Sequence, residues 1–82
     1  DTYFTFFPSE NSNITISIYS INGRFINKKT KEVTAAEFTT IHWDGKDKSG
    51  NEIPNGTYFY HLLAKNNFGK KFEHIQKLTK IK

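Results

Sequence analysis

The chain of 82 residues is long enough for a single domain, and because it has no cysteine, neither disulfides nor thiolate-bound metals stabilise it. Isoleucine, threonine, valine and the aromatic residues fill 32 of the 82 positions and leucine plus alanine only six, a balance that favours strands and argues against a helical bundle. No stretch approaches the roughly 18 apolar residues of a membrane helix, and the net charge of +4 arises in the last 18 residues, which carry six lysines and one glutamate.

The basic end of the chain has two interpretations. A cluster of lysines attracts nucleic acid or an anionic membrane surface. It also protects the exposed edge of a sheet from pairing with another sheet. The second interpretation is favoured because the chain has a single arginine, the residue on which base and phosphate recognition depends most. We therefore expect no nucleic-acid partner.

The first part of the chain predicts three strands separated by turns. Thr2–Phe7 is dense in aromatic residues and ends at a polar turn. In Asn13–Ser20 isoleucine occupies every second position, which is the alternation of a half-buried strand. Asn22 and Gly23 both tolerate positive φ, and they predict a tight hairpin turn that leads into a strand over Arg24–Lys28.

The middle of the chain predicts one strand between two irregular stretches. The polar stretch Lys29–Glu37 is expected to be a loop or crossover. Phe38–Trp43 is expected to be a strand with Ile41 and Trp43 on one face, which places the tryptophan in the core. A long turn region over Asp44–Gly56 follows, with several glycines and a proline.

The last part of the chain predicts two strands. Thr57–Lys65 is apolar on both faces, which is typical of a strand at the centre of a sheet. Beyond a hairpin loop, Lys70–Lys82 alternates imperfectly, and a bulge or a switch between sheets would reconcile its two faces. Six or seven short strands joined by tight turns predict an all-β fold, an antiparallel β-sandwich of about seven strands in one domain over residues 1–82.

Three histidines raise the possibility of a zinc site. His42, His61 and His74 would bind zinc if they converged. Each lies in a different predicted strand without an acidic neighbour at ligand spacing, so ordinary sheet positions are the favoured interpretation. The chain has no nucleophile elbow, phosphate-binding loop or metalloprotease helix motif. We therefore expect neither catalysis nor a cofactor.

The turn region contains oxygen ligands at short intervals, which raises the possibility of calcium binding. Its spacing is not that of an EF-hand, and lysines interrupt the acidic positions. The favoured interpretation is a turn in which Asp44 and Asp47 accept backbone N–H bonds, while Gly45 and Gly50 supply positive φ.

Exposed aromatic side chains would suit a carbohydrate-binding module, in which sugars stack on a platform. The candidates are Trp43, Tyr58 and Tyr60. Core packing is the favoured interpretation, with the tyrosine hydroxyls at the rim of the sandwich. Burial of these three side chains would remove the best residues of the carbohydrate alternative.

Three stretches occur in a familiar order. They are the hairpin Ile18-Tyr-Ser-Ile-Asn-Gly-Arg24, the run from Trp43-Asp-Gly-Lys-Asp47 through Gly50-Asn-Glu-Ile-Pro54 to Asn55-Gly-Thr-Tyr-Phe-Tyr60, and the ending Gln76-Lys-Leu-Thr-Lys-Ile-Lys82. Together they resemble the FlgD-like immunoglobulin-like domains and the related C-terminal sorting domains of the type IX secretion system of Bacteroidota. The resemblance covers residues 2–82 and implies an Ig-like sandwich. The complete Trp-Asp-Gly run favours the FlgD-like branch.

The resemblance implies roles for two sets of residues. The positions that match sorting motifs are Gly23, Ile26, Gly56, Thr57, Tyr58, Lys77, Lys80 and Lys82. The positions that form the structural signature are Trp43, Asp44, Gly45, Asp47, Gly50, Pro54 and Tyr60. Thr57 stands where sorting domains often have valine.

The resemblance also implies a non-catalytic module at the C-terminus of a larger secreted or surface protein, such as a gingipain-like peptidase or sortase. The abrupt start at Asp1 is consistent with a piece of a longer chain. The expected partners are outer-membrane translocon proteins and the N-terminal domains of the parent protein. The expected location is extracellular or at the outer-membrane surface. The alternative function is a carbohydrate-binding or spacer module of an extracellular enzyme.

Overall fold

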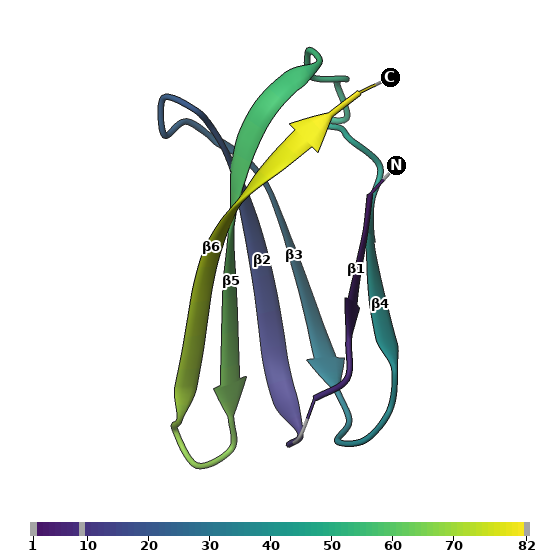
Figure 1. Cartoon of the computed structure of the whole chain (residues 1–82), viewed down its shortest axis with the longest axis vertical. Coiled ribbons are helices and arrows are strands. Elements are labelled where there is room, and N and C mark those ends of the chain that lie inside the picture. The colour runs from purple at the N-terminus through teal and green to yellow at the C-terminus, as the bar shows by residue number, and fades with distance from the viewer. Residues whose placement is uncertain (1, 9, 82) are drawn as a thin grey trace.

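Six strands in two antiparallel sheets make up the described part of the chain, residues 2–8 and 10–81 of a computed structural model (Figure 1). The strands are β1 (Thr2–Phe6), β2 (Ser12–Ser20), β3 (Phe25–Val33), β4 (Thr39–Trp43), β5 (Gly56–Asn66) and β6 (Lys71–Lys80). One sheet has the order β1-β4 and the other β3-β2-β5-β6. The predicted all-β, Ig-like sandwich is confirmed, with six strands among the described residues where about seven were expected.

The core lies between the two sheets. The isoleucines of β2 are buried on its inner face, as their alternation predicted. On the neighbouring strand β5, Tyr58 and Leu62 are also buried, and the ring of Phe4 on β1 meets that of Tyr60 at 5.0 Å between centroids. The buried hydrophobic residues are Phe4, Ile14, Ile16, Ile18, Ile26, Val33, Ile41, Trp43, Ile53, Tyr58 and Leu62. Both sheets contribute to this core, so neither is stable without the other.

The predicted position of Thr57–Lys65 in the centre of a sheet is confirmed. β5 pairs with β2 on one side and with β6 on the other. Because β6 follows β5 at the end of the sheet order, the second edge of β6 has no neighbouring strand among the described residues.

The prediction of a loop over Lys29–Glu37 is wrong for its first half. β3 continues to Val33, and its partner residue there is Ser12 of β2. This part of the sequence is polar because β3 is an edge strand. Its exposed positions carry lysine and glutamate, while Ile26 and Val33 are buried. Charged side chains on an edge strand are compatible with pairing and prevent association with other sheets.

The prediction of a bulge or switch of sheets in the last strand is also wrong. The β5–β6 register runs without a shift from Gly56/Lys80 to Lys65/Lys71. The one register shift in this sheet lies between Ile18 and Tyr19 in the β2–β3 pair. The alternation of β6 is imperfect because β6 lies at the open side of the sandwich, where apolar side chains stay exposed on both faces.

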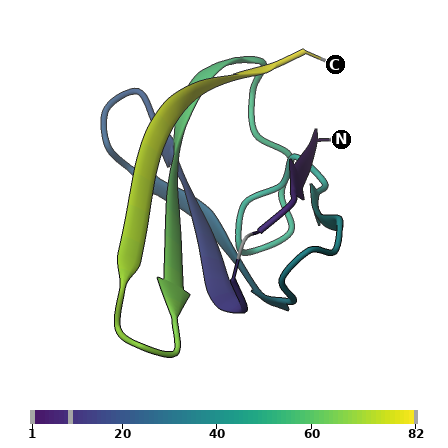
Figure 2. The same ribbon diagram turned by 60° about the horizontal axis from the view of Figure 1, so that its bottom comes forward.

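The described residues form no helix long and apolar enough to cross a membrane. The start of β1 and the end of β6 lie at the same end of the sandwich in both views (Figures 1 and 2).

Trp43 is the largest fully buried side chain, with 0% of its surface exposed. Its indole Nε1–H donates a hydrogen bond of 2.9 Å to the backbone carbonyl oxygen of Lys46. The predicted core position of Trp43, on the same face as Ile41, is confirmed.

We expect Trp43→Phe to lower the free energy of unfolding by about 2 kcal/mol, because it removes buried volume and leaves the Lys46 carbonyl with one donor fewer. Urea titration followed by circular dichroism measures this change. Leu63→Ala, on the half-buried outer face of β5, serves as a control and should cost less than Trp43→Phe. Equal stability of Trp43→Phe and the native chain would contradict the role given to the indole.

Candidate functional site

The positions that the family resemblance singled out gather at one end of the sandwich. We call it the loop end: the β2–β3 turn (21–24), the loop 44–55, the start of β5 and the end of β6 (Figure 1). The strand register brings these segments together, because Ser20 lies opposite Tyr58 and Tyr58 lies opposite Leu78.

The β2–β3 turn is closed by short backbone bonds. Gly23 N–H donates to the Ser20 carbonyl at 2.9 Å, and Ser20 N–H donates to the Arg24 carbonyl at 2.8 Å. Gly23 has a φ of 86°, which a residue with a side chain rarely adopts. The predicted Asn-Gly hairpin is confirmed.

The loop 44–55 is organised by two aspartates. Asp44 Oδ1 accepts a bond of 3.1 Å from Lys46 N–H, and Asp47 Oδ1 accepts bonds of 2.9 Å from the N–H groups of Ser49 and Asn51. Gly45 and Gly50 have φ values of 78° and 88°. The turn interpretation is therefore confirmed, because one carboxylate oxygen of each aspartate accepts backbone N–H groups of the loop.

The same bonds affect the ionisation of Asp47. The backbone N–H of Asn51, and next that of Ser49, hold the pKa of the Asp47 carboxyl below its ordinary value of 3.8. Both donors stabilise the charged carboxylate. Asp47 therefore stabilises the folded loop when it is ionised.

One backbone carbonyl connects the loop to both sheets. The Lys46 oxygen accepts from the indole of Trp43 on β4 at 2.9 Å, and from the side-chain amide of Asn27 on β3 at 3.0 Å. Two residues later, Lys48 N–H donates to the Ile26 carbonyl at 3.0 Å. The loop is thus fastened to β3 and β4 over a span of three residues.

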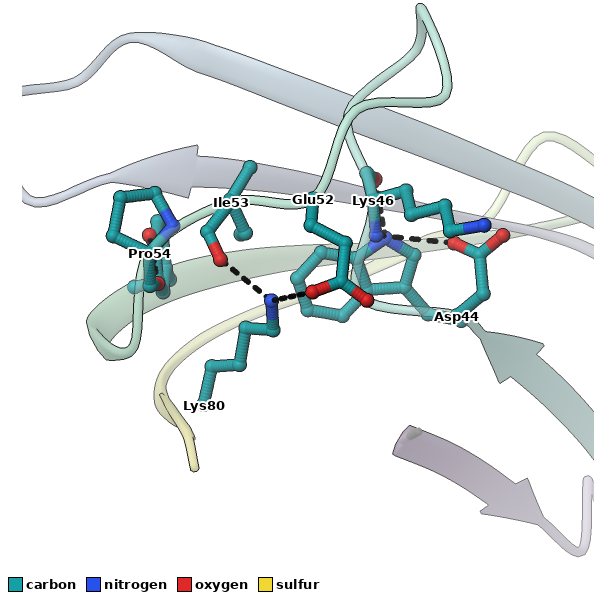
Figure 3. Close-up of polar contacts among 8 residues, drawn as sticks. Asp44, Lys46, Glu52, Ile53, Pro54 and Lys80 are labelled. Atoms are coloured by element: carbon teal, nitrogen blue, oxygen red, sulfur yellow. Dashed lines mark hydrogen bonds and ion pairs between the residues drawn. The ribbon is translucent and has the colours of Figure 1, made fainter. Parts of the chain in front are cut away.

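Lys80, at the end of β6, holds the loop from the other side (Figure 3). Its Nζ donates to the Ile53 carbonyl at 2.5 Å and lies 4.0 Å from the Glu52 carboxylate. Its stem covers Gly45, where an added Cβ would lie 3.1 Å from Lys80 Cε. Only 14% of the Lys80 side chain is exposed, so this lysine supports the loop and presents little charge to solvent.

The aromatic candidates for a carbohydrate platform belong to the core. Trp43 and Tyr58 are buried, and Tyr60 is packed against the core. The Tyr58 hydroxyl donates to the Pro54 carbonyl at 2.6 Å, and the Tyr60 hydroxyl donates to Gln76 Oε1 at 3.1 Å. The rim position predicted for both hydroxyls is confirmed, and the carbohydrate alternative loses these residues.

The sorting candidates divide by exposure. Ile26 and Tyr58 are buried and act through the packing of the loop end. A partner can reach the exposed positions Gly23, Gly56, Thr57 and Lys77. Lys82 lies outside the described residues. The role of all these positions in recognition stays a prediction.

The three histidines do not converge. His42 lies on β4, whereas His61 and His74 belong to the other sheet. His74 lies opposite Leu62, and Leu62 is adjacent to His61 on β5, so the two histidines point to opposite faces of that sheet. Across the described ranges, no group of three or more His, Asp or Glu side chains could hold a metal ion. The zinc alternative has no site among these residues.

Sequence reasoning missed the structural roles of Asn27 and Lys80. Asn27 gave no local signal, since its partner is 19 residues away. For Lys80 a signal existed: it is two residues from Leu78, and that parity turns both side chains toward the inside of the sandwich.

We expect Lys80→Met to lower the free energy of unfolding by about 1–2 kcal/mol. The methionine keeps an aliphatic stem over Gly45 but removes the donor to the Ile53 carbonyl. Chemical denaturation measures the change. The matched control is Lys77→Met on the exposed face of the same strand, for which we expect a change within about 0.5 kcal/mol. Equal costs for the two variants would contradict the supporting role of Lys80.

We expect the stabilisation from Asp47 to be fully present above the ordinary pKa of 3.8 and to be lost as pH falls through the lowered pKa of the folded state. Unfolding free energies measured between neutral and strongly acidic pH test this. Asp47→Asn should be less stable than the native chain at neutral pH, and the difference should shrink on acidification. A difference that is independent of pH would contradict the expectation.

Comparisons with known proteins agree with this geometry. The family described as the FlgD Ig-like domain matches residues 2–67. No curated protein matches the chain. FlgD from P. aeruginosa is similar in structure, with a TM-score of 0.72, 28% identity, and coverage of 94% of this chain and 60% of that one.

Two further solved structures are similar. Dimeric latent PorU from Porphyromonas gingivalis has a TM-score of 0.76 and 26% identity, over 94% of this chain and 8% of that one. FlgD from Xanthomonas campestris, described in connection with the hook capping essential for flagellar assembly, has a TM-score of 0.75 and 21% identity, over 94% of this chain and 55% of that one. The chain thus spans less than two thirds of each of these proteins. From the family match over most of its length, the chain belongs to the FlgD Ig-like domain family.

Proposed function

We propose that this chain is a non-catalytic β-sandwich module that directs a larger surface or secreted protein through, or onto, the type IX outer-membrane secretion machinery. The resemblance of its motifs to type IX sorting domains supports this function, as does its likeness to a segment of PorU. The partners are then the translocon proteins and the N-terminal domains of the parent, which is a candidate peptidase. The location is the outer-membrane surface or the medium.

The observation that carries the proposal is the edge of β6 beside the loop end, which pairs with no strand in the described part of the chain. Gly56 and Thr57 lie opposite Lys80 and Thr79 in the register, so the exposed sorting positions of β5 adjoin the last strand. Lys77, also on β6, is exposed. An unpaired edge offers backbone donors and acceptors to a receptor strand, and the lysine adds charge.

The alternatives are less well supported. The aromatic residues expected to stack on sugars are in the core. A rod-like spacer passes the chain from one end of each module to the other, whereas here the first strand begins and the last strand ends at the same end (Figure 2).

We expect a periplasmic reporter fused to the N-terminus of the chain to reach the surface or medium of a bacterium with a type IX system, and to stay in the periplasm of a strain without the translocon. Lys77→Gln should lower export several-fold, because it removes an exposed charge of β6. Immunoblots of periplasm, surface and medium give the measurement.

The matched control is Lys28→Gln, an exposed lysine on β3 at the opposite edge of the same sheet. It should export as the native chain does. Export that does not depend on the translocon would contradict the proposed function. Equal export of both variants would contradict the β6 edge as the docking element.

A further inference from the structure

A groove of about 670 Å³ opens between β1 and the inner face of the β5–β6 pair. Its walls are mainly apolar and come from both sheets. The residues that matter here are Phe6, Phe7, Leu62, Ala64, Phe72 and His74. The groove exists because the smaller sheet has two strands and the larger has four, so the inner face of β6 has no strand across from it in the described part of the chain. Phe72 is 61% exposed as a result.

One wall of the groove is a strand edge. Among the residues that the structure describes, β1 pairs with β4 alone, and Thr5 and Phe6 of β1 line the groove. In an antiparallel strand, the backbone groups of alternate residues point to opposite sides. Every second residue of β1 therefore directs its N–H and C=O away from β4, where the sheet provides no partner strand. An extended peptide matches the spacing of such a row of alternating donors and acceptors, whereas an acyl chain has no polar groups to pair with it.

One end of the groove is basic. Lys70 and Lys71 line it near the β5–β6 turn. Glu10 also lines the groove, and its carboxylate accepts a hydrogen bond from the Asn66 side chain, so the two lysines exceed the acidic groups at this end by one charge. This end is complementary to a negatively charged group on whatever occupies the groove.

We propose that the groove binds an extended peptide that adds a third strand to the β1-β4 sheet. The peptide pairs with the free edge of β1, places apolar side chains against Ala64 and Phe72, and sets an acidic residue or terminal carboxylate near Lys70. β1 has five residues, which corresponds to roughly 17 Å of strand and an equally short peptide. This site is separate from the β6 edge in the proposed function and does not depend on it.

The test is a titration of the ¹⁵N-labelled chain with synthetic peptides. The probes are four heptapeptides in which threonine alternates with valine, isoleucine, leucine or phenylalanine and the last residue is aspartate with a free carboxylate. We expect at least one to bind with a Kd below about 1 mM. The amide shifts should concentrate in β1 and in the β6 residues that line the groove. The same peptide with a central proline should bind at least tenfold more weakly, because proline cannot donate to the strand edge.

Two pairs of variants locate the site. Ala64→Trp fills the groove, and Leu63→Trp places the same side chain on the outer face of β5; only the first should weaken binding, by about tenfold or more. Lys70→Glu should weaken binding several-fold, and Lys77→Glu, outside the groove, should not. Thermal melts check that each variant is folded, and the proline peptide tests the proposal without any substitution in the chain.

Three results would overturn the proposal. They are the absence of shifts with all four peptides at about 1 mM, equal affinity for the proline peptide, and shifts confined to the outer face of the larger sheet. Each result leaves the export experiment unaffected, because that experiment depends on the translocon and on Lys77.

Discussion

The Lys46 carbonyl is the acceptor on which the rest of the structure depends. It receives the indole N–H of Trp43 and the amide of Asn27, and so joins a loop to one strand of each sheet. A buried indole needs a partner for its N–H, since an unsatisfied donor costs about 1–3 kcal/mol. The loop 44–55 supplies that partner and covers the end of the core. In a domain without disulfides, this is the contact that closes the sandwich.

The loop can serve this purpose because its own hydrogen bonds define its path. Asp44 and Asp47 bind the backbone donors that would otherwise be unpaired, and glycines take the positive φ values. Lys80 on β6 supports the loop through a hydrogen bond to the Ile53 carbonyl. The loop that begins with the Trp-Asp-Gly run and Lys80 of β6 therefore form one structural unit, although Lys80 and its acceptor Ile53 are 27 residues apart in the sequence.

The sequence was most informative where a local pattern determines local structure. The alternating isoleucines, the Asn-Gly turn and the doubly apolar strand after Gly56 predicted β2, its hairpin and the central β5. Patterns failed where a strand lies at an edge: β3 was too polar to be recognised beyond Lys28, and the exposed Ile75 suggested a bulge that β6 does not have. Long-range contacts such as that of Asn27 leave no trace in neighbouring residues. The strand register brings the candidate residues together. The sequence did not show which of them are exposed to solvent, because that depends on the packing of the two sheets.

The place of Lys80 in the last strand has a consequence for the order in which the domain matures. A chain that emerges from a ribosome or a pore with its amino end first exposes the loop well before residue 80. Until that lysine arrives, Gly45 is uncovered and the Ile53 carbonyl lacks its cationic donor. The loop end is therefore complete only after the last strand of the domain has been made, because no earlier residue supplies this donor or this cover.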